Sequence, residues 1–166
     1  MAALCTVSFK GLTIRPANGP KDLKLATAWT AADPDHCKTT RPIFWLEQDF
    51  GIESYVMQDK RGAIFFFKLM RAPMGEIEVH IQFSPLPDDP TKRAEQKDRV
   101  MNALIQGFDW MKTVLALKGT KALFFVSRSP HLIRFSKRHL GFKAEGNRLV
   151  HTFPSPEEKK NHGEES

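Results

Sequence analysis

The sequence predicts a domain of the α+β class, a mixed α/β sandwich whose central, mostly antiparallel sheet carries helices on both faces. Three strand-like runs follow one another between residues 54 and 83 with short connections, as in an antiparallel meander. A long amphipathic segment and a short, wholly apolar run come next. Together these patterns give the element order β-α-α-β-β-β-α-β-α-β.

The chain begins with a strand and a helix. Residues 11–16 alternate apolar and polar side chains, which predicts a strand, and residues 4–9 extend it or form a separate edge segment. Apolar residues at helical spacing then predict a helix from Asp22 to Ala32. Asp33 stops this helix, because the residue before a proline avoids the α region.

A second helix is expected shortly afterwards. Thr39 or Thr40 can cap it, and Pro42 suits its first turn. Its apolar residues are Ile43, Leu46 and Phe50. Their i, i+3, i+7 spacing would place the three side chains on one face of the helix.

The meander and a long helix follow. The three strands are expected at residues 54–58, 63–69 and 75–83. Asp89 followed by Pro90 is a good helix start, since the acid can cap the helix and proline fits the first helical position. One apolar stripe runs from Val100 to Leu115, and the helix can extend to Leu117, where Lys118 and Gly119 end it.

The C-terminal third supplies the remaining elements. Residues 122–126 are wholly apolar and predict a buried strand. A helix is expected at residues 130–140, ended by Gly141, and a closing strand at residues 148–153. A single domain therefore covers residues 1–153, and residues 154–166, which contain no apolar side chain, form a disordered polar tail.

Composition excludes several classes of protein. The chain has 166 residues, of which 41% are hydrophobic and 27% charged, as in an ordinary globular domain. Its 2 cysteines cannot supply a disulfide framework, which favours a reducing compartment, and we expect a cytoplasmic protein. No apolar run is long enough to cross a membrane, and the six histidines lack the spacing of metal ligands, so no membrane or metal is expected.

Positive charge gathers in the C-terminal third. Between Lys118 and Arg148 there are eight basic residues and one acidic residue. Such a field predicts an anionic partner, whether small-molecule phosphates, nucleic acid or an acidic protein surface. The alternative is a solvated basic face without a partner. Nucleic-acid binding ranks lowest, because few aromatic residues are interleaved with the basic ones.

Two short motifs stand out, LTIRP at residues 12–16 and LGF at residues 140–142. Together with the element order they resemble the GNAT superfamily of N-acetyltransferases, and the resemblance extends from about Leu12 to Phe153. Residues 129–135 are also similar to a stretch of acetyltransferase-like proteins of tailed phages. The resemblance implies the GNAT fold, acetyl-CoA or another acyl-CoA as co-substrate, and transfer of the acyl group to an amine.

The resemblance also implies where the acyl-CoA would bind. In the family its pyrophosphate lies on backbone N–H groups at a helix start, which is a general anion site. The family signature falls on residues 96–101, where Gln96 fits but Arg99 and Met101 replace small residues. Charge from Lys97 and Arg99 would compensate; a solvated helix end is the alternative. The expected cofactor-binding residues are Ile81, Phe83, Gln96, Lys97, Arg99, Val100, Met101, Ser127 and Ser129.

Catalytic candidates lie on the third strand of the meander. Glu76, Glu78, His80 and Gln82 alternate with apolar residues and so share one face of the strand. Family members use a carboxylate here as general base; Glu78 or Glu76 would take the proton of the amine, and His80 would relay it. A half-solvated strand would show the same alternation. Lys137 stands where the family often has a tyrosine acid.

Two functions remain open at this stage. One is an acyl-CoA-dependent N-acyltransferase. The other is a non-catalytic binding or assembly protein on the same fold, phage-encoded and forming a homo-oligomer, which the missing glycines and tyrosine favour. Binding of CoA would discriminate between them.

Overall fold

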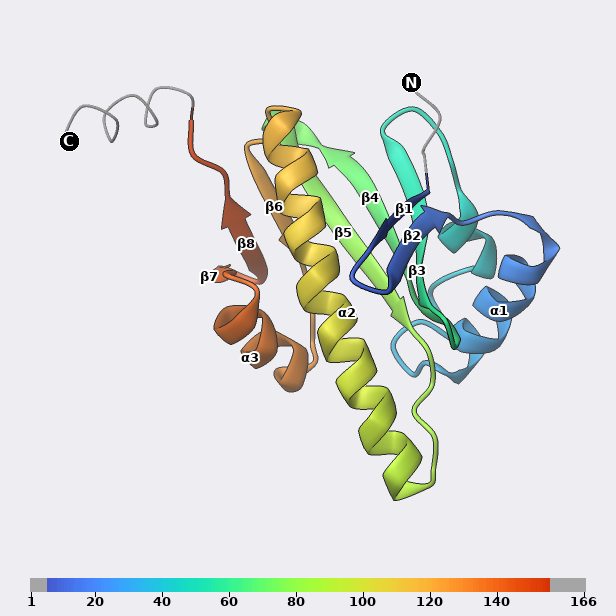
Figure 1. The fold of residues 1–166 in the computed structure, drawn as a ribbon. Coiled ribbons are helices and arrows are strands. Elements are labelled where there is room, and N and C mark those ends of the chain that lie inside the picture. The colour runs from blue at the N-terminus through green and yellow to red at the C-terminus, as the bar shows by residue number, and fades with distance from the viewer. Residues whose placement is uncertain (1–5, 156–166) are drawn as a thin grey trace. The chain divides into compact units, whose positions relative to one another are not determined.

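The computed structural model describes residues 6–155, and these contain one eight-stranded sheet with helices (Figure 1). The strand order is β1-β2-β3-β4-β5-β6-β8-β7, and the pairing is mostly antiparallel. The strands are β1 (Val7–Phe9), β2 (Leu12–Pro16), β3 (Ile52–Asp59), β4 (Gly62–Ala72), β5 (Glu76–Phe83), β6 (Ala122–Phe125), β7 (Lys143–Glu145) and β8 (Arg148–Thr152). The helices are α1 (Gly19–Ala32), α2 (Pro90–Leu117) and α3 (Pro130–His139), with 3-10 turns η1 (Pro42–Leu46) and η2 (Pro73–Gly75). The predicted α+β class is confirmed.

The prediction of a second helix after residue 40 is wrong. Only the 3-10 turn η1 forms, and Phe50 is 76% exposed instead of packing against the sheet. The reason lies in Gln48, whose side chain accepts from the backbone N–H of Ser54 at 3.2 Å and donates to its carbonyl at 2.6 Å. This side chain bonds the backbone of β3, and the chain turns into the strand where a helix would have continued. The apolar spacing gave no hint of that competing contact.

The strand β7 was not expected from the sequence. It pairs with β8 across a turn in which Gly146 has a φ of +60°. All three of its residues are exposed, so the strand lacks the apolar alternation on which the sequence analysis relied.

The chain forms two compact units, and each is described by itself. The first contains residues 1–70 and 80–107, and the second contains residues 71–79 and 108–166. The extent of a single domain over residues 1–153 stays a prediction. Most of the expected polar tail, residues 156–166, lies outside the described residues.

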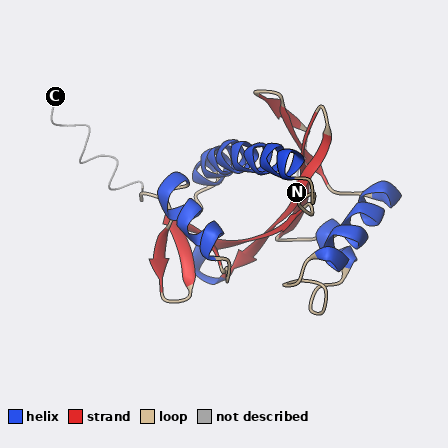
Figure 2. Ribbon diagram, turned by 90° about the horizontal axis from the view of Figure 1, so that it is seen from below, coloured by secondary structure: helices blue, strands red, loops and turns tan. Residues whose placement is uncertain are grey.

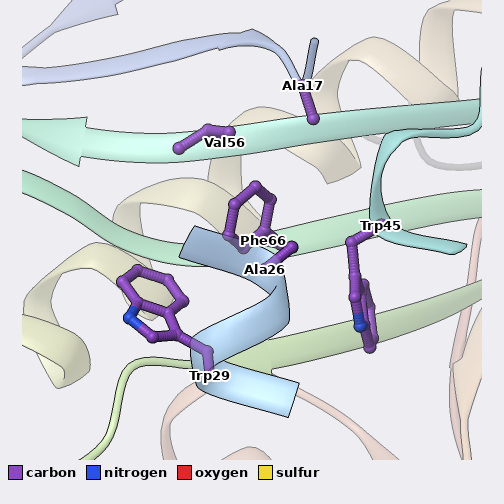
Figure 3. Packing of buried hydrophobic residues seen from close by; sticks show 6 residues of the cluster. All are labelled: Ala17, Ala26, Trp29, Trp45, Val56 and Phe66. Carbon is purple, nitrogen blue, oxygen red and sulfur yellow. The ribbon is translucent and has the colours of Figure 1, made fainter. Parts of the chain in front are cut away.

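In the first unit, α1 and η1 cover one face of the strands. Val56 of β3 lies opposite Phe66 of β4 in the register, and both point into a cluster with Trp29 (Figure 3). The rings of Trp29 and Phe66 meet edge to face at 5.3 Å, a favourable geometry for aromatic pairs. The cluster consists of Ala17, Ala26, Trp29, Trp45, Val56 and Phe66.

The first part of α2 covers the opposite face of the same strands (Figure 2). Met57 and Phe65 point to this side, and atoms of both side chains lie within 4 Å of the position that a Cβ would take at Gly107 of the helix. A Cβ at position 107 would lie 2.8 Å from the methyl carbon of Met57. Glycine therefore lets helix and sheet approach more closely than any other residue would.

The second unit has an aromatic core at the LGF motif. Gly141 has a φ of +73°, which suits glycine and ends α3. Phe142 is then buried edge to face against Phe108 of α2, at 5.3 Å, and Phe125 of β6, at 5.1 Å. In the LGF motif, the glycine therefore ends the helix and the phenylalanine packs into the core.

Candidate functional site

The polar and apolar residues of β5 point to opposite sides, as the alternation predicted. His80 packs its ring edge to face on Phe44 of η1 at 5.4 Å. Gln82 contacts the segment after α1. Phe83 instead meets Phe65 at 5.9 Å on the α2 side. In the first unit, the polar row therefore faces α1 and η1.

Three polar side chains form a network that we call the Gln82 cluster: Asp33, His36 and Gln82. Gln82 is 0% exposed. Its amide nitrogen donates to Asp33 Oδ2 at 2.9 Å, and its amide oxygen lies 2.7 Å from Nδ1 of His36. His36 Nδ1 is also 3.1 Å from Asp33 Oδ2. A buried amide is costly unless it is paired, and here both of its ends are satisfied.

A buried lysine fixes the residues beside His80. Lys68 of β4 has a fully buried side chain, which donates to the carbonyl of Phe44 at 2.9 Å and forms an ion pair with Glu47. Its ammonium also lies 3.5 Å from the centre of the Phe44 ring. A cation above an aromatic face is attracted to it. Lys68 thereby holds η1 against the sheet and sets the ring that His80 contacts.

Both carboxylates of β5 are half-buried, and Glu76 is paired with an arginine. In the second unit, Glu76 accepts a hydrogen bond from Arg148 at 2.8 Å, and this bond raises the pKa of the guanidinium above its ordinary value. Arg148 also lies 3.8 Å from Glu145 and stacks on Phe124 at 4.5 Å. Glu78 is half-buried. Glu76, one of the two predicted bases, therefore forms an ion pair with Arg148.

The segment expected to bind pyrophosphate lies inside a continuous helix. Because α2 begins at Pro90, the backbone N–H groups of residues 96–101 belong to the interior of the helix. The helix N-terminus itself is capped by Asp89, whose carboxylate accepts from the N–H of Lys92 at 2.9 Å. A carboxylate of the chain thus occupies the place where an external anion would bind.

Two of the predicted cofactor-binding residues form hydrogen bonds to other residues of the first unit. Gln96 donates to the hydroxyl of Ser84 at 2.7 Å. Arg99 makes two hydrogen bonds of 2.6 Å to Asp59 and one of 2.8 Å to the carbonyl of Gly62. The bond from Arg99 holds the pKa of Asp59 below its ordinary value. Arg99 therefore fixes the β3–β4 turn by hydrogen bonds to both of its ends.

The remaining predicted residues are divided between the two units. Lys97 and Met101 are exposed on α2, while Ile81, Phe83 and Val100 are half-buried. In the second unit, Ser129 caps α3 by accepting from the N–H of Leu132 at 3.3 Å, and Ser127 accepts from the N–H of Ser129 at 3.1 Å. The roles of all these residues in binding a cofactor stay predictions.

The basic residues of the C-terminal third form an exposed surface around α3. The helix contains no acidic residue, and its last turn is basic. The exposed cations are Arg128, Arg134, Lys137, Arg138 and Lys143. Within residues 6–155, no group of three or more His, Cys, Asp or Glu side chains could hold a metal ion, and no helix has the length and hydropathy to cross a membrane.

The sequence matches no described protein family and no curated protein, but the fold matches solved structures. A variant form of the spermidine/spermine N-acetyltransferase of Vibrio cholerae superposes with a TM-score of 0.59 at 14% identity, covering 94% of this chain and 100% of the other. The GNAT domain of an S. lividans protein gives 0.54 at 14% identity, covering 86% and 90%. The ribosomal-protein-S5-alanine acetyltransferase of Vibrio fischeri gives 0.53 at 12%, covering 89% and 96%. The chain therefore has the fold of GNAT acetyltransferases.

Sequence analysis missed the Gln82 cluster. Asp33 was read as a helix stop and His36 only as an unsuitable metal ligand. Gln82 is 46 residues from His36 and 49 from Asp33 in the chain. No local pattern connects positions so far apart; they meet because the segment after α1 packs against β5.

Proposed function

We propose that this protein is an N-acyltransferase that moves an acyl group from an acyl-CoA to an amine. The observation that carries the proposal is the row of Glu76, Glu78 and His80 on one side of β5. This row occurs in a fold shared with proteins described as N-acetyltransferases. Those proteins are named for a polyamine and for an alanine of a ribosomal protein, so an amine is the acceptor class that we propose here.

The reaction needs a group that removes a proton from the acceptor. The amine nitrogen attacks the thioester carbonyl, a C–N bond forms, the C–S bond breaks and the CoA thiolate leaves. The nitrogen must lose a proton for the amide to form. Glu78 or Glu76 of β5 would serve as this general base. His80 would pass the proton on.

Acyl-CoA, the acyl donor, would be bound by side chains here and not by backbone N–H groups at a helix start. The capped start of α2 does not suit a pyrophosphate, since the Asp89 carboxylate accepts from the N–H of Lys92 and would repel a second anion. Side-chain charge must then replace backbone donors. Lys97 and its neighbours Lys92 and Arg93 are exposed on α2 and can approach phosphate oxygens.

The second candidate is a non-catalytic binding or assembly protein on this fold. Two other contacts favour it: Asp89 caps the start of α2 with a negative charge, and Arg99 is bound to Asp59, so neither the helix start nor this arginine is available to phosphates. The exposed cations around α3 would then serve an anionic partner, for which an acidic protein surface or nucleic acid is a proposal.

The test is release of CoA thiol from acetyl-CoA with a panel of polyamines, amino acids and peptides. We expect turnover that falls by about 10²–10⁴-fold in Glu78→Gln or in Glu76→Gln, the range for losing a general base. Lys24→Ala, at an exposed position of α1, is the control and should stay near the wild-type rate. Full activity in both glutamine variants would contradict a general base on β5, and a folded protein inactive with every amine would favour the non-catalytic candidate.

A further inference from the structure

The exposed side of α3, in the second unit, is basic from its first turn to its last. His131, Arg134 and Arg138 follow one another at i, i+3 and i+7, so their side chains share one face of the helix. Lys137, three residues after Arg134, extends this face. All four side chains are exposed, whereas Ser136 on the opposite side of the helix is buried. We call these four residues the α3 basic face; three of them are cations, the two arginines and the lysine.

The three cations of the α3 basic face form no ion pair with a carboxylate of residues 6–155. The side chain of Arg134 contacts Nδ1 of His131 at 3.2 Å, which joins two members of the face to each other. Elsewhere in the same unit, the carboxylates of Glu76 and Glu145 lie 2.8 Å and 3.8 Å from Arg148. The charge of the face therefore has no counter-ion within the described part of the chain.

The helix dipole accounts for only part of this charge. Cations are favourable near a helix C-terminus, which suits Lys137 and Arg138 in the last turn. Arg134 lies in the middle of the helix, beyond the reach of this effect. Arg128 precedes the helix start, where the positive end of the dipole disfavours a cation. An anion bound along the helix would interact favourably with all of these charges.

The composition of the α3 basic face indicates which class of anion it fits. Within residues 6–155, none of the exposed large apolar side chains belongs to α3. Protein interfaces have an apolar or aromatic centre and few lysines, and a helix that lies on a membrane needs a free apolar face. A phosphate backbone is bound mainly by charge, with arginine and lysine as donors. The face therefore fits nucleic acid better than an acidic protein or a membrane.

The aromatic residues of α3 distinguish a duplex from a single strand. Phe135 is half-buried, and its ring lies 5.0 Å from that of His139. Proteins that bind single strands stack successive bases on aromatic side chains. Phe135 is the one phenylalanine, tyrosine or tryptophan of α3, so the helix lacks such a row. The scarcity of aromatic residues in this third of the sequence thus argues against a single strand, but not against a duplex, whose bases already stack on one another.

We propose that the α3 basic face binds double-stranded nucleic acid through its phosphate backbone, without reading the bases. The three cations contact phosphates, and the planar guanidinium groups of the two arginines can each donate two hydrogen bonds to one phosphate. The inference goes beyond acyl transfer. It uses residues of the second unit only and holds for either candidate function.

The test is fluorescence anisotropy of a labelled DNA duplex titrated with the full chain. Three phosphate contacts predict a plot of log K against log salt with a slope of about −2.7, which is a loss of about 40-fold between 50 and 200 mM salt. The triple variant Arg134→Gln, Lys137→Gln and Arg138→Gln should lose this binding. It should keep its melting temperature, because the three side chains are exposed.

A matched control separates the position of the charges from their number. Lys21→Gln, Lys24→Gln and Lys38→Gln together remove the same charge from exposed positions of the first unit, and this variant should bind the duplex nearly as tightly as the wild type. Equal losses in the two triple variants, or no binding in 50 mM salt, would overturn the proposal. Tighter binding of a single strand would refute the duplex, and binding of poly-glutamate in its place would identify an acidic protein surface instead.

Discussion

The two ends of β5 carry the same alternation but treat their polar side chains differently. At the beginning, Glu76 forms an ion pair with Arg148 in which the side chains are 25% and 32% exposed. At the end, Gln82 is 0% exposed and completes a network with Asp33 and His36. A surface pair contributes little because water competes for both partners. A buried amide has no such substitute, so its partners become obligatory.

The first prediction concerns the buried end and has the largest effect. Gln82→Leu keeps the volume but leaves the Asp33 carboxylate and the Phe83 carbonyl without their donor. We expect the free energy of unfolding, measured with urea at pH 7, to fall by about 1–3 kcal/mol. Asp33→Asn should be less than additive with it, because the two side chains bond directly. Strict additivity would contradict a shared network.

The pair between Asp59 and Arg99 is intermediate, with side chains 18% and 14% exposed. The hydrogen bond from Arg99 lowers the pKa of Asp59, with burial acting in the opposite direction. A carboxyl with a lowered pKa adds stability above its unfolded value of about 3.9, and this contribution is lost as the pH falls through the lower folded value. Asp59→Asn should thus be less stable than the wild type at pH 7, by less than Gln82→Leu.

The pH dependence is the check on that pair. The difference in urea midpoint between wild type and Asp59→Asn should stay constant from pH 7 down to about 4 and shrink below the unfolded value of about 3.9, because the unfolded chain then binds a proton that the folded, ion-paired carboxylate does not. A difference that stays constant below that value as well would mean that the pair contributes by shape alone.

The smallest effect is expected at the exposed end. In Glu76→Gln the amide still accepts from Arg148, and the guanidinium keeps its stacking on Phe124. We expect no measurable shift of the thermal midpoint in 0.15 M salt. A loss as large as that of Gln82→Leu would show that exposure does not rank these interactions.

Most of the fold could be predicted because alternation and helical spacing are local signals. The strands of the meander, the full length of α2 and the LGF turn all followed from them. The second helix could not be ruled out, since the contact of Gln48 with Ser54 depends on how the chain folds back. β7 was invisible because its three residues are exposed.

The site could be predicted only along one strand. Period-two alternation placed His80 and Gln82 on one face, and the structure agrees. What those side chains meet depends on residues from other elements, such as His36 and Phe44. The same holds for Arg99, whose bonds to Asp59 reach across 40 residues of sequence.

Binding of acetyl-CoA tests the central claim most directly. At about 100 times its dissociation constant, a ligand adds about 2.7 kcal/mol of stability, which raises the melting temperature by a few degrees. We expect such a rise with acetyl-CoA in the wild type, a smaller one in Lys97→Ala, and the full rise in the control Lys24→Ala on α1. The absence of any shift at millimolar acetyl-CoA would contradict the acyltransferase and leave a GNAT fold used for binding alone.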